Sequence, residues 1–285
     1  MLYKYLRCEI GISVLKDQVV RFTQPGALND PFEMRPAVVG YDSPEAMDKQ
    51  LEDIRPLALQ EAYAAKSLTY RDRVTFEGFR RSTTGLWASI KEVMKQNAAL
   101  DALEFWDRSL YLLDRLVGIL CLAEHRDSLL MWSHYADQHQ GVAIGLDSSH
   151  GFFNQTPVPE VPQFGKLHRV RYALDRPVCN LMDLKEFSLL LVKSAEWGYE
   201  HEHRMLLPLE GATRPRKKGD EFPIALFALP SDAIAEVVLG ARMTDVNRGS
   251  ILDILRTTAG YKHVRVYQAR PAARRFELEV EEIGI

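Results

Sequence analysis

A long helical segment between two groups of strands is the feature that most constrains the fold of this chain. From residue 44 to residue 115 the sequence is rich in Ala, Leu, Glu, Lys and Gln, and its apolar residues recur three and four positions apart. Short runs of β-branched, aliphatic and aromatic residues come before and after it, at 19–23, 117–122 and 141–147. The pattern predicts a sheet whose strands are separated in the sequence by helices.

The second half of the chain is expected to continue this sheet. Its patterns predict strands at 167–172, 222–229, 235–239, 263–268 and 275–282, and helices at 180–197 and 244–257. No Gly/Ser/Pro linker separates two self-sufficient halves, and 285 residues lie at the upper end of what one core supports. We therefore predict an α+β fold: a single domain over 1–285 with a mixed or antiparallel sheet as its core and a helical insertion at 44–115.

The composition and charge of the chain limit the cellular compartment and the kinds of partner that we expect for it. Its three cysteines are widely spaced and form no CxxC pair, which argues against a disulfide framework and a cysteine zinc site. No window reaches the ~20 apolar residues of a membrane helix. These observations predict a cytoplasmic protein. The formal charge of −3 gives no basic field, so nucleic-acid contact would need a local patch, and the clusters at 214–218 and 270–275 are more typical of solvated loops.

Three polar segments are candidates for a binding or catalytic site. The first, Asn29-Asp30-Pro31-Phe32-Glu33, follows a predicted strand. Asn or Asp before proline is typical of a structural turn, because the side chain can hydrogen-bond the backbone two residues on. Ligand-binding side chains are also dense here, at a strand end where sites are common. Both interpretations of Asn29, Asp30 and Glu33 stay open.

The second segment spans residues 131–141 and resembles one or two helical turns. Trp132 and Tyr135 would share one side, which favours a core role for both, while His134 and Asp137 are three apart and can face one cleft. His134 and His139 are five apart and do not match a helical zinc pair. We therefore assign no residue to a metal centre.

The third segment, residues 196–204, is the strongest candidate. On an extended strand, Glu200, Glu202 and Arg204 would share one face. Such a row is also found on solvated faces with a weak salt bridge. A carboxylate and an arginine held together can, however, position ribose hydroxyls and phosphates.

The motifs in combination resemble the DUF2971 family of bacterial and phage-associated proteins of unknown function. The resemblance rests on Tyr-Lys-Tyr (3–5), Leu-Asn-Asp-Pro-Phe-Glu (28–33), Trp-Ser-His-Tyr-Ala-Asp-x-His-x-Gly (132–141), Trp-x-Tyr-Glu-x-Glu-x-Arg (197–204) and Glu-Val-Val-Leu-Gly (236–240). It covers most of the chain and favours, without requiring, a single site formed by the three segments. It implies no reaction.

By analogy, the order of these parts is similar to that of ADP-ribosyltransferases. In this hypothesis NAD or another nucleotide is the substrate, a protein or nucleic acid is the acceptor, and the protein works in a bacterial defence or toxin system. The site residues divide by role. The expected catalytic residues are Glu200, Glu202 and His134, and the expected substrate-binding residues are Tyr5, Asn29, Asp30, Glu33, Trp132, Tyr135 and Arg204, with the arginine on a phosphate.

Two other functions are consistent with the same residues. One is a metal-dependent phosphodiesterase or nuclease, in which Mg²⁺ or Mn²⁺ would be bound by Asp30, Glu33, His134, Glu200 and Glu202. The other is a module that binds a nucleotide or a partner without turnover. The sequence does not fix the oligomeric state.

Overall fold

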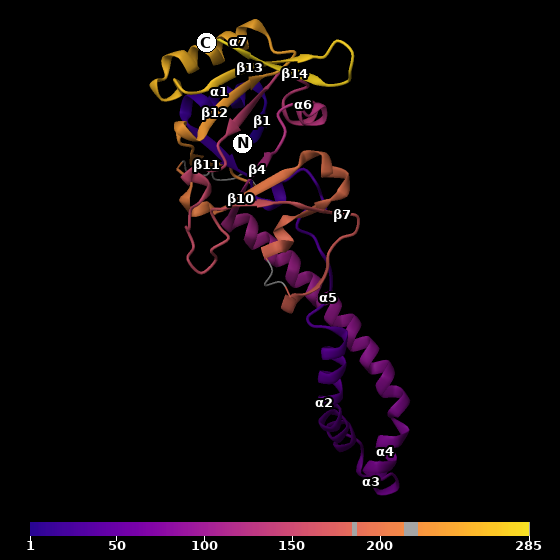
Figure 1. Ribbon diagram of the computed structural model, residues 1–285. Helices are drawn as coiled ribbons and strands as arrows, with labels where there is room; N and C mark the ends of the chain where they lie inside the picture. Colours follow the sequence, from indigo (N-terminus) through magenta and orange to yellow (C-terminus); the bar gives the residue numbers. More distant parts are fainter. Residues whose placement is uncertain (184–186, 214–221, 285) are drawn as a thin grey trace. The chain divides into compact units, whose positions relative to one another are not determined.

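The computed structural model describes residues 1–183, 187–213 and 222–284 (Figure 1). The chain separates into two compact units. Unit 1 consists of Met1–Met34, Leu110–Asp175 and Leu190–Ile285, and unit 2 consists of Arg35–Ser109 and Arg176–Leu189.

Unit 1 is built on an eight-stranded sheet with the strand order β14-β13-β12-β5-β1-β4-β10-β6. The strands are β1 (Leu2–Leu6), β4 (Val117–Ala123), β5 (Val142–Leu146), β6 (Leu167–Arg169), β10 (Glu202–Pro208), β12 (Ile234–Leu239), β13 (Arg265–Pro271) and β14 (Leu278–Ile283). All neighbours are antiparallel except β12 and β13. The predicted α+β class with a mixed sheet is confirmed.

Smaller two-stranded sheets accompany the large one. In unit 1 they are formed by β2 (Val19–Phe22) with β11 (Ala225–Ala228), and by β7 (Arg171–Ala173) with β9 (Val192–Ser194). In unit 2 the pair is β3 (Ala37–Gly40) with β8 (Val178–Asn180). The strand predicted at 167–172 is therefore two short strands, β6 and β7, that join different sheets.

Both faces of the large sheet in unit 1 are covered, and strand alternation explains how. Leu2 belongs to the larger core cluster, which includes residues of α1 (Cys8–Asp17) and α7 (Asp245–Thr257). Tyr3 and Tyr5 point the other way, into a smaller cluster with residues of α6 (Leu129–Tyr135). The smaller cluster provides the apolar side of the candidate site described below.

The predicted helical segment consists of four helices. They are α2 (Pro44–Ala64), α3 (Leu68–Arg73), α4 (Phe76–Ser82) and α5 (Thr84–Leu116). The first three begin after Ser43, Ser67 and Thr75, each of which accepts a backbone N–H with its side chain and so caps the free end. Among the helices that the structure describes, none is both long and apolar enough to cross a membrane. That these helices are an insertion in a single domain stays a prediction.

The helix predicted over 180–197 is wrong. Its described residues form 3₁₀ turns at Leu181–Asp183, Phe187–Leu191 and Ala195–Glu200, with β9 between the last two. A 3₁₀ turn also brings residues three apart to one side, so the spacing of Phe187, Leu190 and Leu191 does not distinguish it from an α-helix. Pairing of β9 with β7 then excludes a continuous helix.

Candidate functional site

A cavity of about 250 Å³ in unit 1 brings together six of the ten predicted site residues. It lies on the side of the sheet that carries the smaller core cluster. The predicted residues that line it are Tyr5, Asn29, Glu33, Tyr135, Glu200 and Glu202. Segments that are far apart in the sequence thus meet at one place.

The register of β4 and β10 sets the position of the acidic wall. Glu202 pairs with Ala123 and Arg204 with Cys121, so both side chains point to the cavity side while His203 points to the opposite face. The expected extended row from Glu200 to Arg204 is interrupted, because His201 has a left-handed backbone with φ of 43°. Glu200 instead ends a 3₁₀ turn and reaches the cavity from there.

Lys193 lies at the centre of a buried ionic cluster and was not among the predicted site residues. Its Nζ is 3.2 Å from Glu33 Oε1, 2.6 Å from Glu200 Oε2 and 3.4 Å from Glu202 Oε2. The same ammonium lies 4.7 Å from the centre of the Trp197 ring. Lys193, Glu200 and Glu202 are each only 4% exposed. A charge this deeply buried is stable only because it is paired.

Arg204 is the second cation of the cluster, and it is not among the residues that line the cavity. Its Nε donates to Glu202 at 2.8 Å, its Nη1 to the carbonyl of Leu190 at 3.0 Å, and its Nη2 to Glu33 and Glu202. The side chain is 0% exposed. The alternative of a solvated strand face is therefore wrong, and the expected contact of Arg204 with a phosphate is not open to a fully enclosed guanidinium. Arg204 instead positions two carboxylates.

The charges of this cluster do not cancel. Three carboxylates face two cations, Lys193 and Arg204, among the residues that the structure describes. Burial raises the pKa of Glu33 even though Arg204 and Lys193 oppose this. Burial acts in the same direction on Glu202, but Arg204 and Lys193 outweigh it and lower its pKa to about 2. Glu202 is thus a fixed anion, and Glu33 is the carboxyl more easily protonated.

A chain of hydrogen bonds links Glu200 to Asn29, which is exposed. The Tyr135 hydroxyl donates to Glu200 Oε1 at 2.6 Å, and the Asn29 amide donates to the Tyr135 oxygen at 2.9 Å. Burial and the hydrogen bond to Glu200 raise the pKa of Tyr135, so this hydroxyl keeps its proton. With Lys193 on its other oxygen, Glu200 is held at both ends.

The segment 29–33 is both a turn and part of the site. Asp30 Oδ1 accepts the backbone N–H of Phe32 at 2.9 Å, as expected for a turn-forming aspartate. Asn29 and Glu33, on either side, line the cavity. Asp30 therefore positions its neighbours and is not itself on the cavity wall.

Two predicted residues of α6 do not line the cavity. Trp132 is 0% exposed, packs edge-on against Tyr5 with ring centres 5.3 Å apart, and donates from Nε1 to the Arg126 carbonyl. It is a core residue, as its helical position favoured, and its burial gives no support to the expected contact with substrate. His134 is exposed, with its ring 6.2 Å from that of Tyr199, and lies outside the cavity lining.

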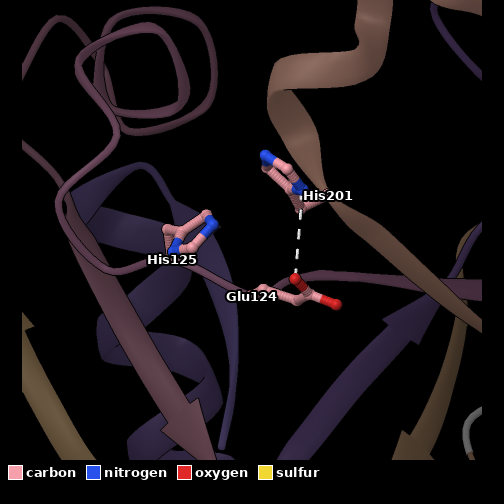
Figure 2. Close-up of side chains that lie close together, drawn as sticks. All are labelled: Glu124, His125 and His201. Atoms are coloured by element: carbon pink, nitrogen blue, oxygen red, sulfur yellow. Dashed lines mark ion pairs between the residues drawn. The ribbon is translucent and has the colours of Figure 1, made fainter.

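A second group of side chains with metal-ligating atoms was also missed. Glu124 and His125 directly follow β4, and His201 directly precedes β10 (Figure 2). One ligand atom of each residue lies within 4.8 Å of the others. Strand pairing alone brings them together, since no spacing within one segment links residues 124 and 201.

Comparison with known protein families gives a match over part of the chain. The sequence model of a family described as "Protein of unknown function (DUF2971)" matches residues 131–205. No curated protein and no solved structure matches the chain. The matched region contains most of α6 and also Lys193, Glu200, Glu202 and Arg204. The match confirms the resemblance to the DUF2971 family over residues 131–205, which contain the motifs at 132–141 and 197–204.

Proposed function

We propose that the cavity binds the nicotinamide–ribose end of NAD, or a nucleotide of similar chemistry, and that Glu200 stabilises the ribose during ADP-ribosyl transfer. The observation that carries the proposal is the excess of carboxylate over cation in the buried cluster, at a cavity that also has aromatic walls. An anionic site of fixed geometry is suited to a substrate that becomes positively charged as it reacts.

The chemistry of this transfer explains the need for a carboxylate. The bond between the nicotinamide nitrogen and ribose C1′ breaks, and nicotinamide leaves with the electron pair. The ribose becomes oxocarbenium-like until a lone pair of the acceptor forms the new bond to C1′ and the proton of the acceptor passes to solvent. Glu200 is already held by Tyr135 and Lys193, so it would stabilise that charge with little reorganisation.

The other wall residues have roles that follow from their positions. Tyr5 and Tyr135 offer apolar ring surface to the nicotinamide. Lys4, which lines the cavity and donates to the Cys121 carbonyl at 3.0 Å, takes the phosphate role first given to Arg204. Pockets for whole drug-sized ligands hold ~300–1,000 Å³. A cavity of about 250 Å³ therefore suits one end of NAD, with the rest outside.

The metal-dependent phosphodiesterase finds less support in this geometry. The Lys193 ammonium already takes the place between Glu33, Glu200 and Glu202 where a cation would be bound. Asp30 is engaged in its turn, and His134 lies outside the cavity lining. These five residues do not form one ligand set around an open centre.

Glu200→Gln is expected to lower the rate of NAD cleavage by about 10²–10³-fold, the effect of removing one group that stabilises transition-state charge. Glutamine keeps the size of the side chain. Its one oxygen can accept from Lys193 and its amide N–H can donate to the Tyr135 oxygen, so the fold should be retained. The rate is measured as free nicotinamide released from labelled NAD, with protein and nucleic-acid acceptors added in turn.

Glu196→Gln is the matched control, because Glu196 is an exposed glutamate four residues away. Its rate should equal that of the unsubstituted protein. The proposal is overturned if the unsubstituted protein releases no nicotinamide and labels no acceptor. Thermal stabilisation by nucleotide without product would instead identify a binding module.

A further inference from the structure

We propose that Glu124, His125 and His201 bind a divalent transition-metal ion such as Zn²⁺. These residues offer one carboxylate and two imidazoles, a ligand set typical of Zn²⁺ and of Ni²⁺ or Co²⁺ rather than of Mg²⁺. The site is separate from the ionic cluster of Lys193, and it involves none of the residues to which a role in NAD binding was assigned.

The present geometry needs only a small contraction to bind the metal. The three ligand atoms lie within 4.8 Å of one another. Tetrahedral Zn²⁺ with ligands at ~2.0–2.1 Å places neighbouring ligand atoms about 3.3 Å apart. The side chains of Glu124 and His201 are 31% and 42% exposed, and His125 is exposed, so their rotamers can adjust. Figure 2 shows both rings beside the carboxylate.

The two oxygens of Glu124 have different neighbours. Oε2 faces His201 Nδ1 at 3.9 Å, whereas Oε1 lies 3.5 Å from Arg169 Nε and 3.7 Å from His203 Nε2. Oε2 is thus directed at the metal position, and Arg169 holds the other oxygen and orients the carboxylate. Such support by a neighbouring donor is usual for carboxylates that bind metals.

The backbone also places His201 for this role. His201 has φ of 43° and occupies the end of a 3₁₀ turn, where glycine is the residue that fits without strain. A histidine at this point places its Nδ1 3.9 Å from Glu124 Oε2, and its ring centre 4.7 Å from that of His125. Strained positions of this kind concentrate at functional sites.

An exposed ion pair is the competing interpretation, and pH separates the two. The contact between Glu124 and His201 is ionic only when the imidazole is protonated. Metal binding requires neutral imidazoles and therefore strengthens as they lose their protons. The metal titration is therefore made at pH 8.

Three protein ligands would leave a fourth position for water or another ligand, as in catalytic zinc sites. His201 lies between Glu200 and Glu202 in the sequence, so the metal would also fix the turn that carries two carboxylates of the ionic cluster. Metal binding and NAD cleavage are nevertheless separate measurements. Failure of one leaves the other standing.

The test is calorimetric titration of the full chain with Zn²⁺ at pH 8, supported by the visible spectrum of the Co²⁺ form. The unsubstituted protein should bind one equivalent of Zn²⁺, and Co²⁺ should give the intense visible bands of a four-coordinate site. His125→Ala and His201→Gly should each lower the affinity at least tenfold. His201→Gly removes the ligand and relieves the left-handed residue, so it should fold and melt at or above the temperature of the metal-free parent.

His134→Asn serves as control, since His134 is an exposed histidine outside the group. Its affinity for Zn²⁺ should equal that of the parent. Absence of binding by the parent would overturn the proposal. So would equal affinities of the parent and the His125 and His201 variants, because the metal would then be held elsewhere.

Discussion

Replacement of Lys193 by methionine is expected to destabilise the protein by about 3–5 kcal/mol at pH 7, because it leaves buried carboxylates without their shared cation. Three glutamates contact this one ammonium, and Arg204 touches only two of them. Methionine fills nearly the same volume, so the loss would reflect charge rather than packing. Urea unfolding at 25 °C measures it.

The loss of stability caused by Lys193→Met should become smaller as the pH falls. Without Lys193, the pKa of Glu33 in the folded protein should rise further above its value in the unfolded chain, because burial already raises this pKa in the native cluster and Lys193 opposes the rise. A carboxyl whose pKa is higher in the folded state favours folding when it is protonated, and this contribution is lost as the pH rises through that pKa. The variant should therefore lie closer to the parent at pH 5 than at pH 7.

Lys262→Met is the matched control, because Lys262 is exposed. It should change the free energy of unfolding by less than about 0.5 kcal/mol. A Lys193 variant that is unfolded at pH 7 and regains its fold at pH 5 would agree with the expectation. An equal, small effect at both pH values would contradict the buried cluster.

The sequence identifies the polar residues of the site better than it identifies their environment. Glu200, Glu202, Tyr135 and Asn29 were found because polar side chains are dense in short segments, and the structure brings these four to one cavity. The burial of Arg204 could not be predicted from the alternation of side chains along β10. Charged residues at every second position are found both on a face exposed to solvent and on a face where they pair with buried partners.

Residues whose partners come from distant segments were missed. Lys193 lies in a stretch whose apolar spacing suggested a helix, and its partner Glu33 is in another part of the sequence. His201 meets Glu124 and His125 only through the pairing of β4 with β10. Spacing rules detect ligands within one element, so they cannot find sites that strand pairing assembles.

Replacement of Trp132 by alanine is expected to cost about 3–5 kcal/mol, the range for truncating a large buried aromatic residue. Trp132 is 0% exposed, and alanine would remove its edge-on contact with Tyr5 and its hydrogen bond to the Arg126 carbonyl. Thermal and urea unfolding measure the loss. Phe276→Ala is the matched control, because that ring is 100% exposed, and it should be nearly neutral.

Variants of Trp132 also distinguish a role in the core from a role in lining the cavity. Trp132→Phe restores most of the volume but not the hydrogen bond to Arg126, so it should recover most of the stability lost in Trp132→Ala. Nucleotide binding by Trp132→Phe should match that of the parent, because Tyr5 and Tyr135, not Trp132, line the cavity. If Trp132→Ala had nearly unchanged stability but bound nucleotide much more weakly, Trp132 would instead be a residue that contacts the ligand.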